Sequence, residues 1–283
     1  MSIATILLPL NGLAEDSIAA STALRAAKPF NAHVTAMFVH PDSAEAVPLL
    51  GMPLTGEALQ IIVDTQTQLS LAASKAARRT LLAACRREDV AFVETPGRHD
   101  AATCSFQEQH GHPAKIIAEA ASLADLTVLC PRAGIPESYE TILDVLLKAR
   151  RPVLAATEEP RESFRRIAIG WDGSACAANA MFAAMPWLEL ARSVEIVTID
   201  RDPDSDLGNL DAYLKLRGIS STATNLKADR HAVHEVLIAY ARRTQPDMLV
   251  IGGFGHSRVR ETLFGGVTID VLLHARVPVF LTH

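Results

Sequence analysis

The chain has 283 residues, 49% hydrophobic and 21% charged, which is enough apolar sequence for two ordinary domains or one large one and excludes a disordered chain. Its net charge is −5 and its pI about 6.1, so electrostatics gives no reason to expect nucleic acid or an anionic membrane as a partner. Aromatic residues make up only 5%. The core should therefore consist of Ala, Leu, Ile and Val, which suits parallel strands covered by helices.

The start of the chain shows no targeting signal. The segment MSIATILLPLNG has no basic residue before its apolar run, and Pro9 and Asn11 interrupt that run early. We therefore expect no signal peptide, and no membrane span either, because no stretch of about 18 uncharged apolar residues occurs. The four cysteines form no CxxC pair and are expected to be reduced thiols. These features predict a soluble, cytoplasmic protein.

The two halves of the chain repeat one pattern in the same order. In each half, an apolar run ends in Asn-Gly or Asp-Gly before an Ala-rich helical pattern, and two further apolar runs follow later. Three matched runs in the same order indicate an internal duplication. The matched segments are 4–12 with 166–174, 124–130 with 246–252, and 151–155 with 277–281.

Each half is predicted to alternate strands and helices, which favours a parallel sheet with right-handed crossovers. The sequence therefore predicts an α/β fold with two tandem five-stranded parallel-sheet domains and flanking helices. Their expected bounds are 1–157 and 164–283, separated by a polar stretch at 157–163. The expected strands are 4–10, 32–40, 89–95, 125–130 and 152–156, then 166–171, 193–200, 220–226, 247–252 and 277–282.

The first half carries two additional segments. Residues 42–88 begin with a region rich in Pro and Gly and continue as a helix to about Arg87. Residues 95–113 are polar and are expected to form a loop, and loops of this length are usually functional or mobile. This loop holds residues that could bind zinc, but their spacing matches no closed zinc site. They are His99, Cys104, His110 and His112.

The second half contains a glycine-rich loop between a strand and a helix. A buried strand ends at Gly252, Gly253 and Gly255 follow, and Gly265 and Gly266 precede a helix to about residue 275. Glycines let the backbone come close to a ligand, and successive backbone N–H groups can hold phosphate oxygens. The start of the helix adds free N–H groups and a favourable dipole. This arrangement indicates an anion site at the carboxyl ends of the strands.

This pattern resembles the universal stress protein (UspA) family, whose ATP-binding members have a glycine, two residues, a glycine, nine residues, and a glycine followed by Ser or Thr. Gly252, Gly255 and Gly265 have this spacing, Asp172-Gly173 matches the end of the first strand, and the resemblance covers both halves. It implies a tandem, two-domain member with an adenine-nucleotide α-hydrolase-like, Rossmann-like fold. It further implies that the halves pack as an intramolecular pseudo-dimer, while association of two chains as a homodimer stays open.

The resemblance also implies the residues of an ATP site, with Mg²⁺, in the second half. Asp172 would lie beside the adenosine, backbone groups near Ile199 would contact adenine, and the glycines would line the path of the ribose and phosphates. One departure is Gly266, where ATP-binding members have Ser or Thr, and Thr268 is the nearest replacement. Losing a charge-assisted hydrogen bond of about 1–3 kcal/mol would weaken binding by one or two decades. The other polar candidates nearby are His256, Ser257, Arg258 and Arg260.

The first half is expected to hold no nucleotide. Asn11 replaces the aspartate, and Pro131, Arg132 and Gly134 replace the regular glycine pattern. A proline removes a backbone N–H that a phosphate site would need.

The leading hypothesis is therefore a stress-response binding and regulatory module with unidentified protein partners, gated by one adenine nucleotide. No catalytic residue and no metal ligand is assigned, because no Walker A, GxSxG or HExxH motif is present. Two alternatives stay open. One is a weak nucleotide hydrolase that uses Asp172 and Mg²⁺. The other is a ligand- or zinc-binding protein that uses the first-half insertion.

Overall fold

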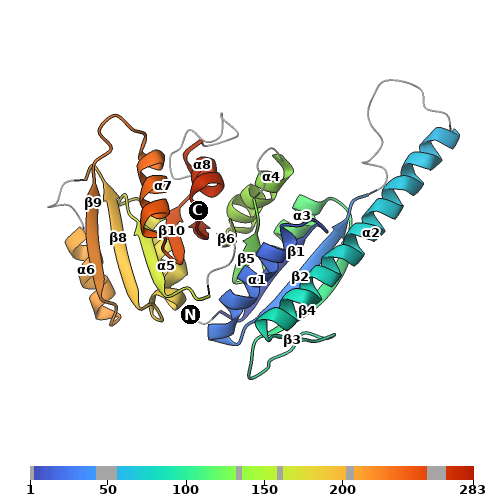
Figure 1. The fold of residues 1–283 in the computed structure, drawn as a ribbon, viewed down its shortest axis with the longest axis horizontal. Coiled ribbons are helices and arrows are strands. Elements are labelled where there is room, and N and C mark those ends of the chain that lie inside the picture. Colours follow the sequence, from blue (N-terminus) through green and yellow to red (C-terminus); the bar gives the residue numbers. More distant parts are fainter. Residues whose placement is uncertain (1–2, 43–55, 132–135, 158–161, 202–206, 254–265) are drawn as a thin grey trace.

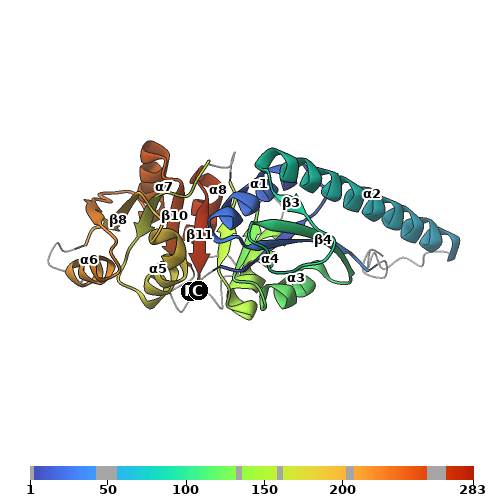
Figure 2. The same cartoon turned by 90° about the horizontal axis from the view of Figure 1, so that it is seen from below.

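The computed structural model describes residues 3–42, 56–131, 136–157, 162–201, 207–253 and 266–283. In these residues, eleven strands form one sheet, and helices lie on both sides of it (Figures 1 and 2). The α/β class with a mostly parallel sheet and flanking helices is confirmed. The strand order is β3-β4-β2-β1-β5-β6-β11-β10-β7-β8-β9.

The elements of each half follow in chain order. The first half contains β1 (Thr5–Leu10), α1 (Asp16–Ala27), a 3-10 turn (Lys28–Phe30), β2 (His33–His40), α2 (Gly56–Glu88), β3 (Ala91–Phe92), β4 (Thr103–His110), α3 (Pro113–Ala121), β5 (Leu126–Leu129), α4 (Pro136–Asp144), a π-helical turn (Val145–Ala149) and β6 (Val153–Ala155). The second half contains β7 (Arg166–Gly170), α5 (Ala175–Leu188), β8 (Ser193–Ile199), α6 (Leu207–Leu216), β9 (Ser221–Leu226), α7 (Val233–Thr244), β10 (Met248–Gly252), α8 (Gly266–His274) and β11 (Val279–Thr282).

The edge of the first half differs from the expectation. Residues 89–95 contribute only the two-residue strand β3, and the long strand β4 lies inside the segment 95–113 that was expected to be a loop. β4 pairs in parallel with all eight residues of β2, from His33↔Thr103 to His40↔His110. Its first residues are buried and its last ones are exposed. The sequence TCSFQEQH therefore shows little apolar alternation, which is why the strand was not predicted.

The two halves join through their last strands. β6 and β11 pair antiparallel, with Leu154 opposite Phe280, whereas the other strand pairs are parallel. The expected pair of separate five-stranded sheets is therefore wrong in two details: the described residues of the first half form six strands, and the two sheets join into one. Because the direction reverses at this junction, the carboxyl ends of the strands lie at opposite edges of the sheet in the two halves.

The core continues across the junction. One cluster of buried residues covers one face of the sheet beneath α1, α2, α5 and α6, and a second cluster covers the other face beneath α3, α4, α7 and α8. Phe30 of the first half contacts the ring of Trp187 edge-on at 5.1 Å, and Trp187 in turn lies 5.7 Å from the ring of Phe280. The halves thus share apolar packing as well as strand hydrogen bonds.

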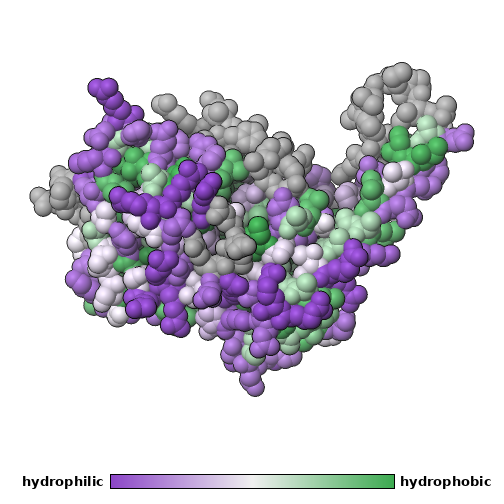
Figure 3. All heavy atoms as spheres, in the orientation of Figure 1, coloured by the Kyte–Doolittle hydropathy of each residue, from purple (hydrophilic) through white to green (hydrophobic). Residues whose placement is uncertain are grey.

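Helix α2 is the most distinctive element. The expected helix in segment 42–88 is confirmed, and it ends at Glu88. Its C-terminal turns bury Ala77, Leu81 and Cys85 against the body, while its N-terminal turns extend beyond the sheet (Figures 1 and 2). Exposed apolar side chains follow the extending part, among them Leu59 and Ile61 (Figure 3). Within the described residues, no helix combines the length and the apolar character needed to cross a membrane.

Candidate functional site

Three of the residues predicted for the nucleotide site lie at one edge of the sheet. β7 is parallel to β10 on one side and to β8 on the other, with Gly170 opposite both Ile251 and Val197. The carboxyl ends of these three strands therefore lie side by side at one edge of the sheet. This register brings Asp172, Ile199 and Gly252 to the same edge, which is where open α/β sheets bind ligands.

Asp172 shapes the turn after β7. Its Oδ1 accepts the backbone N–H of Ser174 at 2.9 Å, and Gly173 between them has a φ of 73°. Ser174 is the residue that caps α5, because its Oγ accepts the N–H of Ala177 at 3.1 Å. The N-cap of α5 is therefore Ser174 and not the neighbouring Asp172. Asp172 holds the turn that places the cap.

Arg201 was not found from the sequence. It follows β8 by two residues, and its guanidinium donates a hydrogen bond to the backbone carbonyl of Asp172. A cation thus lies at the edge where the predicted nucleotide residues meet. The sequence signal that could have identified Arg201 is its position directly after the predicted strand 193–200. A single arginine at such a position is also common on a solvated surface, so this signal alone does not indicate a binding residue.

Gly252 has a packing role of its own. A Cβ at this position would lie 2.5 Å from the backbone N of Ala177 and 2.5 Å from the carbonyl carbon of Cys176. The end of β10 therefore packs directly on the first turn of α5, and only glycine allows this approach. The glycine therefore contributes to packing whether or not a nucleotide binds.

The remaining predicted residues lie around the start of α8. Gly266 and Thr268 are in the first turn of this helix. The free N–H groups of such a turn attract anions. The others lie outside the described residues: Gly255, His256, Ser257, Arg258, Arg260 and Gly265.

The corresponding edge of the first half is built differently. The carboxylate of Asp16 accepts the backbone N–H groups of Asn11 at 3.1 Å and Gly12 at 2.7 Å, and the Asn11 side chain accepts the N–H of Leu13 at 3.0 Å. A Cβ on Gly12 would collide with the backbone of Ala73 in α2, since it would lie 2.7 Å from the Ala73 Cα. The N–H groups of this turn are thus already bound by an internal anion and covered by a helix.

Burial and hydrogen bonding shift the pKa of Asp16 in opposite directions. Its side chain is only 3% exposed. Desolvation raises the pKa of Asp16, and the backbone N–H groups of Asn11 and Gly12 oppose this rise without cancelling it.

The proposed zinc ligands of residues 95–113 do not come together. Cys104 is buried at the start of β4, whereas His110 ends that strand and stacks on His40 at 4.7 Å. Six residues of strand separate Cys104 from His110 by about 20 Å, too far to share one ion. In the described part of the chain, no group of three or more His, Cys, Asp or Glu residues could hold a metal ion.

The fold defines a Rossmann-like α/β protein, and the turns after β7, β8 and β10 lie together at one edge of its sheet. The comparisons agree. A universal stress protein from Archaeoglobus fulgidus has a similar structure, with a TM-score of 0.65 and 16% identity over 98% of this chain and 97% of that one. A functionally unknown protein from Pseudomonas aeruginosa PAO1 has a TM-score of 0.59 and 13% identity over 99% and 92%. At these identities the likeness shows the fold.

The sequence comparisons point to the same family as these structures. Residues 210–283 match the model of the Universal stress protein family. Universal stress protein Slr1230 of Synechocystis is 29% identical over 129 residues, which cover 44% of this chain and 44% of that relative. A domain of the universal stress protein family is therefore recognised at the C-terminal end of the chain, in agreement with the resemblance seen in its sequence.

Proposed function

We propose that this protein is a stress-response binding and regulatory module, and that its second half binds one ATP or another adenine nucleotide, with Mg²⁺. The observation that carries the proposal is the level edge of β8, β7 and β10, where Asp172, Ile199 and Gly252 end neighbouring strands. The family's domain at 210–283 also contains the whole glycine pattern.

Arg201 extends this site. Its guanidinium is held at the turn of Asp172, where it would favour the negative charge of a phosphate. We assign to it a supporting role in binding.

Two features suit a cytoplasmic regulatory role. All four cysteines are free, which fits a reducing compartment. The antiparallel pairing of β6 with β11 gives the halves the relation of two partners in a symmetric dimer, so we infer an intramolecular pseudo-dimer. Its protein partners would recognise the nucleotide state of the second half.

The test is nucleotide analysis of protein denatured directly after purification, together with a thermal shift on adding ATP and Mg²⁺. We expect at most one nucleotide per chain and a stabilising shift that is lost in Asp172→Ala and in Gly255→Val. Asn11→Ala, at the matching position of the first half, should leave the shift unchanged. Two nucleotides per chain, or a shift that Asp172→Ala does not reduce, would contradict the proposal. Turnover that needs Mg²⁺ and Asp172 would favour the hydrolase instead.

A further inference from the structure

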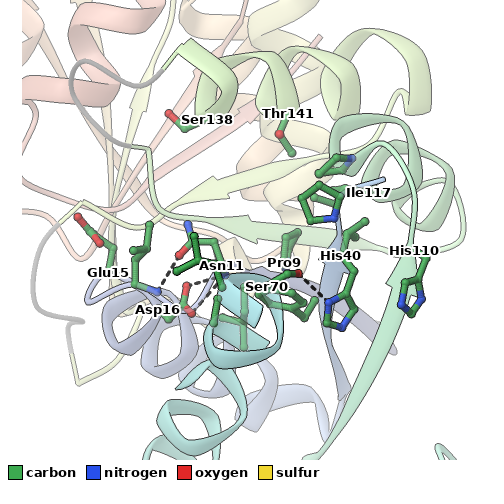
Figure 4. A pocket seen from close by; sticks show the side chains of 18 of the residues that line it. Pro9, Asn11, Glu15, Asp16, His40, Ser70, His110, Ile117, Ser138 and Thr141 are labelled. Atoms are coloured by element: carbon green, nitrogen blue, oxygen red, sulfur yellow. Dashed lines mark hydrogen bonds between the residues drawn. The ribbon is translucent and has the colours of Figure 1, made fainter. Parts of the chain in front are cut away.

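A cavity of about 620 Å³ lies in the first half, at the carboxyl ends of β1, β2 and β5 (Figure 4). Asn11 and Asp16 line it on one side, His40 and His110 on another, and Ser138 and Thr141 of α4 face it from across the opening. Helix α2 contributes Gln66, Thr67, Leu69, Ser70, Leu71 and Ala73 to its wall. Its size is typical of pockets that hold small organic molecules.

The wall of the cavity is mainly apolar. Leu10, Phe38, Ile117 and Leu129 come from three strands and a helix, and Leu69 comes from α2. Such a surface binds a ligand by removing apolar area from water, at about 25 cal/mol per Å². The ligand must therefore carry a substantial apolar part.

The charges at the cavity disfavour an anion. Its described lining includes the carboxylates of Glu15, Asp16 and Asp42 and contains neither Lys nor Arg. The turn N–H groups that could hold a phosphate are bound by Asp16, and the backbone of Ala73 covers Gly12. A phosphate or carboxylate in this cavity would meet repulsion and no free nest of donors.

One polar wall is fixed in place. His40 Nδ1 lies 2.7 Å from Ser70 Oγ, and His40 Nε2 lies 3.2 Å from a carboxylate oxygen of Glu108. In the tautomer that carries its proton on Nε2, facing the Glu108 carboxylate, His40 Nδ1 accepts a hydrogen bond from the Ser70 hydroxyl. Ser70 Oγ keeps lone pairs for a hydrogen bond from a ligand. This wall would recognise a neutral hydroxyl or amide donor.

We propose that the first-half cavity is a separate binding site for an uncharged, largely apolar small molecule with one polar donor, enclosed by α2 and distinct in chemistry from the nucleotide site of the second half. The duplicated edge thus has two specificities. One edge would take a nucleotide. At the other edge, Asp16 occupies the backbone N–H groups that an anion would need, and α2 covers the cavity.

The first test uses the neutral dye Nile red as the probe. We expect saturable fluorescence with one site per chain. Ser138→Trp places an indole in the cavity and should weaken binding at least tenfold. Glu140→Trp is the matched control: it lies on the same helix, is exposed, does not line the cavity, and should leave binding unchanged. Equal binding by both variants would place the dye elsewhere and overturn the proposal.

The second test uses the wild-type chain, so it does not depend on the folding of a variant. 1-Naphthalenemethanol and 1-naphthoate share one ring system and differ in the charge of the head group. The alcohol should displace Nile red at least tenfold more effectively than the carboxylate, and ATP with Mg²⁺ should not displace it. Equal competition by the two ring compounds, or displacement by ATP, would overturn the proposal. Loss of ATP binding alone would leave this site unaffected and count only against the proposed nucleotide site.

Discussion

The carboxylate of Asp16 accepts the backbone N–H of Gly12 at 2.7 Å, across the turn that joins β1 to α1. In the second half, the matching turn is held by the Asp172 side chain, which accepts the N–H of Ser174 instead. The same βα turn is thus organised by a carboxylate from the following helix in one half and by a carboxylate within the turn in the other. This difference is the basis for expecting two different ligands.

Asp16→Ala should destabilise the fold by about 1–3 kcal/mol, because it leaves two N–H groups of a tight turn without their acceptor. Asp16→Asn keeps an acceptor oxygen and should cost less. Urea unfolding followed by circular dichroism measures both changes. A loss below about 0.5 kcal/mol for Asp16→Ala, the range of ordinary surface changes, would contradict this role.

Gly252→Ala should destabilise the protein by about 1–3 kcal/mol in the absence of any nucleotide, because its Cβ would press against the first turn of α5. Gly253→Ala is the neighbouring control. Its Cβ would lie 3.2 Å from the carbonyl oxygen of Thr282, so a small shift relieves the contact and the loss should be smaller. Thermal unfolding of both variants without nucleotide measures these losses. Equal stability of Gly252→Ala and the wild type would mean that Gly252 serves ligand binding only and has no packing role.

Phe280→Ala should remove apolar contacts at the junction of the two halves and cost about 3–5 kcal/mol. Phe280 is fully buried, lies in β11 opposite Leu154, and contacts Trp187. Scanning calorimetry should show one cooperative transition for the wild type and a lower, broader or divided one for the variant. Phe182→Ala, at a ring that is 51% exposed, is the control and should change little.

Glu108→Gln should flatten the dependence of stability on acid pH. The Ser74 hydroxyl, and after it His40, hold the pKa of Glu108 below its ordinary value. A lowered pKa means stability that is present above the ordinary value and is lost as pH falls through the folded value. Because the side chain is 48% exposed, the effect should be about 1 kcal/mol or less. Melting temperatures between about pH 7 and about pH 3 measure it.

The matched control for this pH series is Glu94→Gln, at a carboxylate that is 85% exposed and 3.8 Å from Arg78. The melting temperature of this variant should change with pH in the same way as that of the wild type. Equal slopes for the Glu108 variant and the wild type would show that Glu108 does not contribute to acid sensitivity.

Much of the fold could be predicted from local pattern. β1, β2, β7, β8 and β10 were expected from apolar runs of strand length, and α2 from its long helical pattern. β4 was missed because its exposed half carries Gln, Glu and His, so its pairing with β2 holds it without an apolar signal. The duplication and the strand-end aspartate were visible because both depend on residues close in sequence.

The contacts that give each site its chemistry join residues far apart in the chain. Three of these contacts depend on how separate elements pack. They are the packing of Ala73 on Gly12, the hydrogen bonds of His40 with Ser70 and Glu108, and the hydrogen bond from Arg201 to Asp172. By itself, the sequence determined the βα repeat and the glycine pattern on which the family resemblance rests, because local backbone preference and hydrophobic periodicity encode them. Only the tertiary structure decided that the two sheets join antiparallel and that the first-half edge encloses a cavity whose described lining contains no Lys or Arg. Those outcomes depend on long-range pairing and packing, which no short segment specifies.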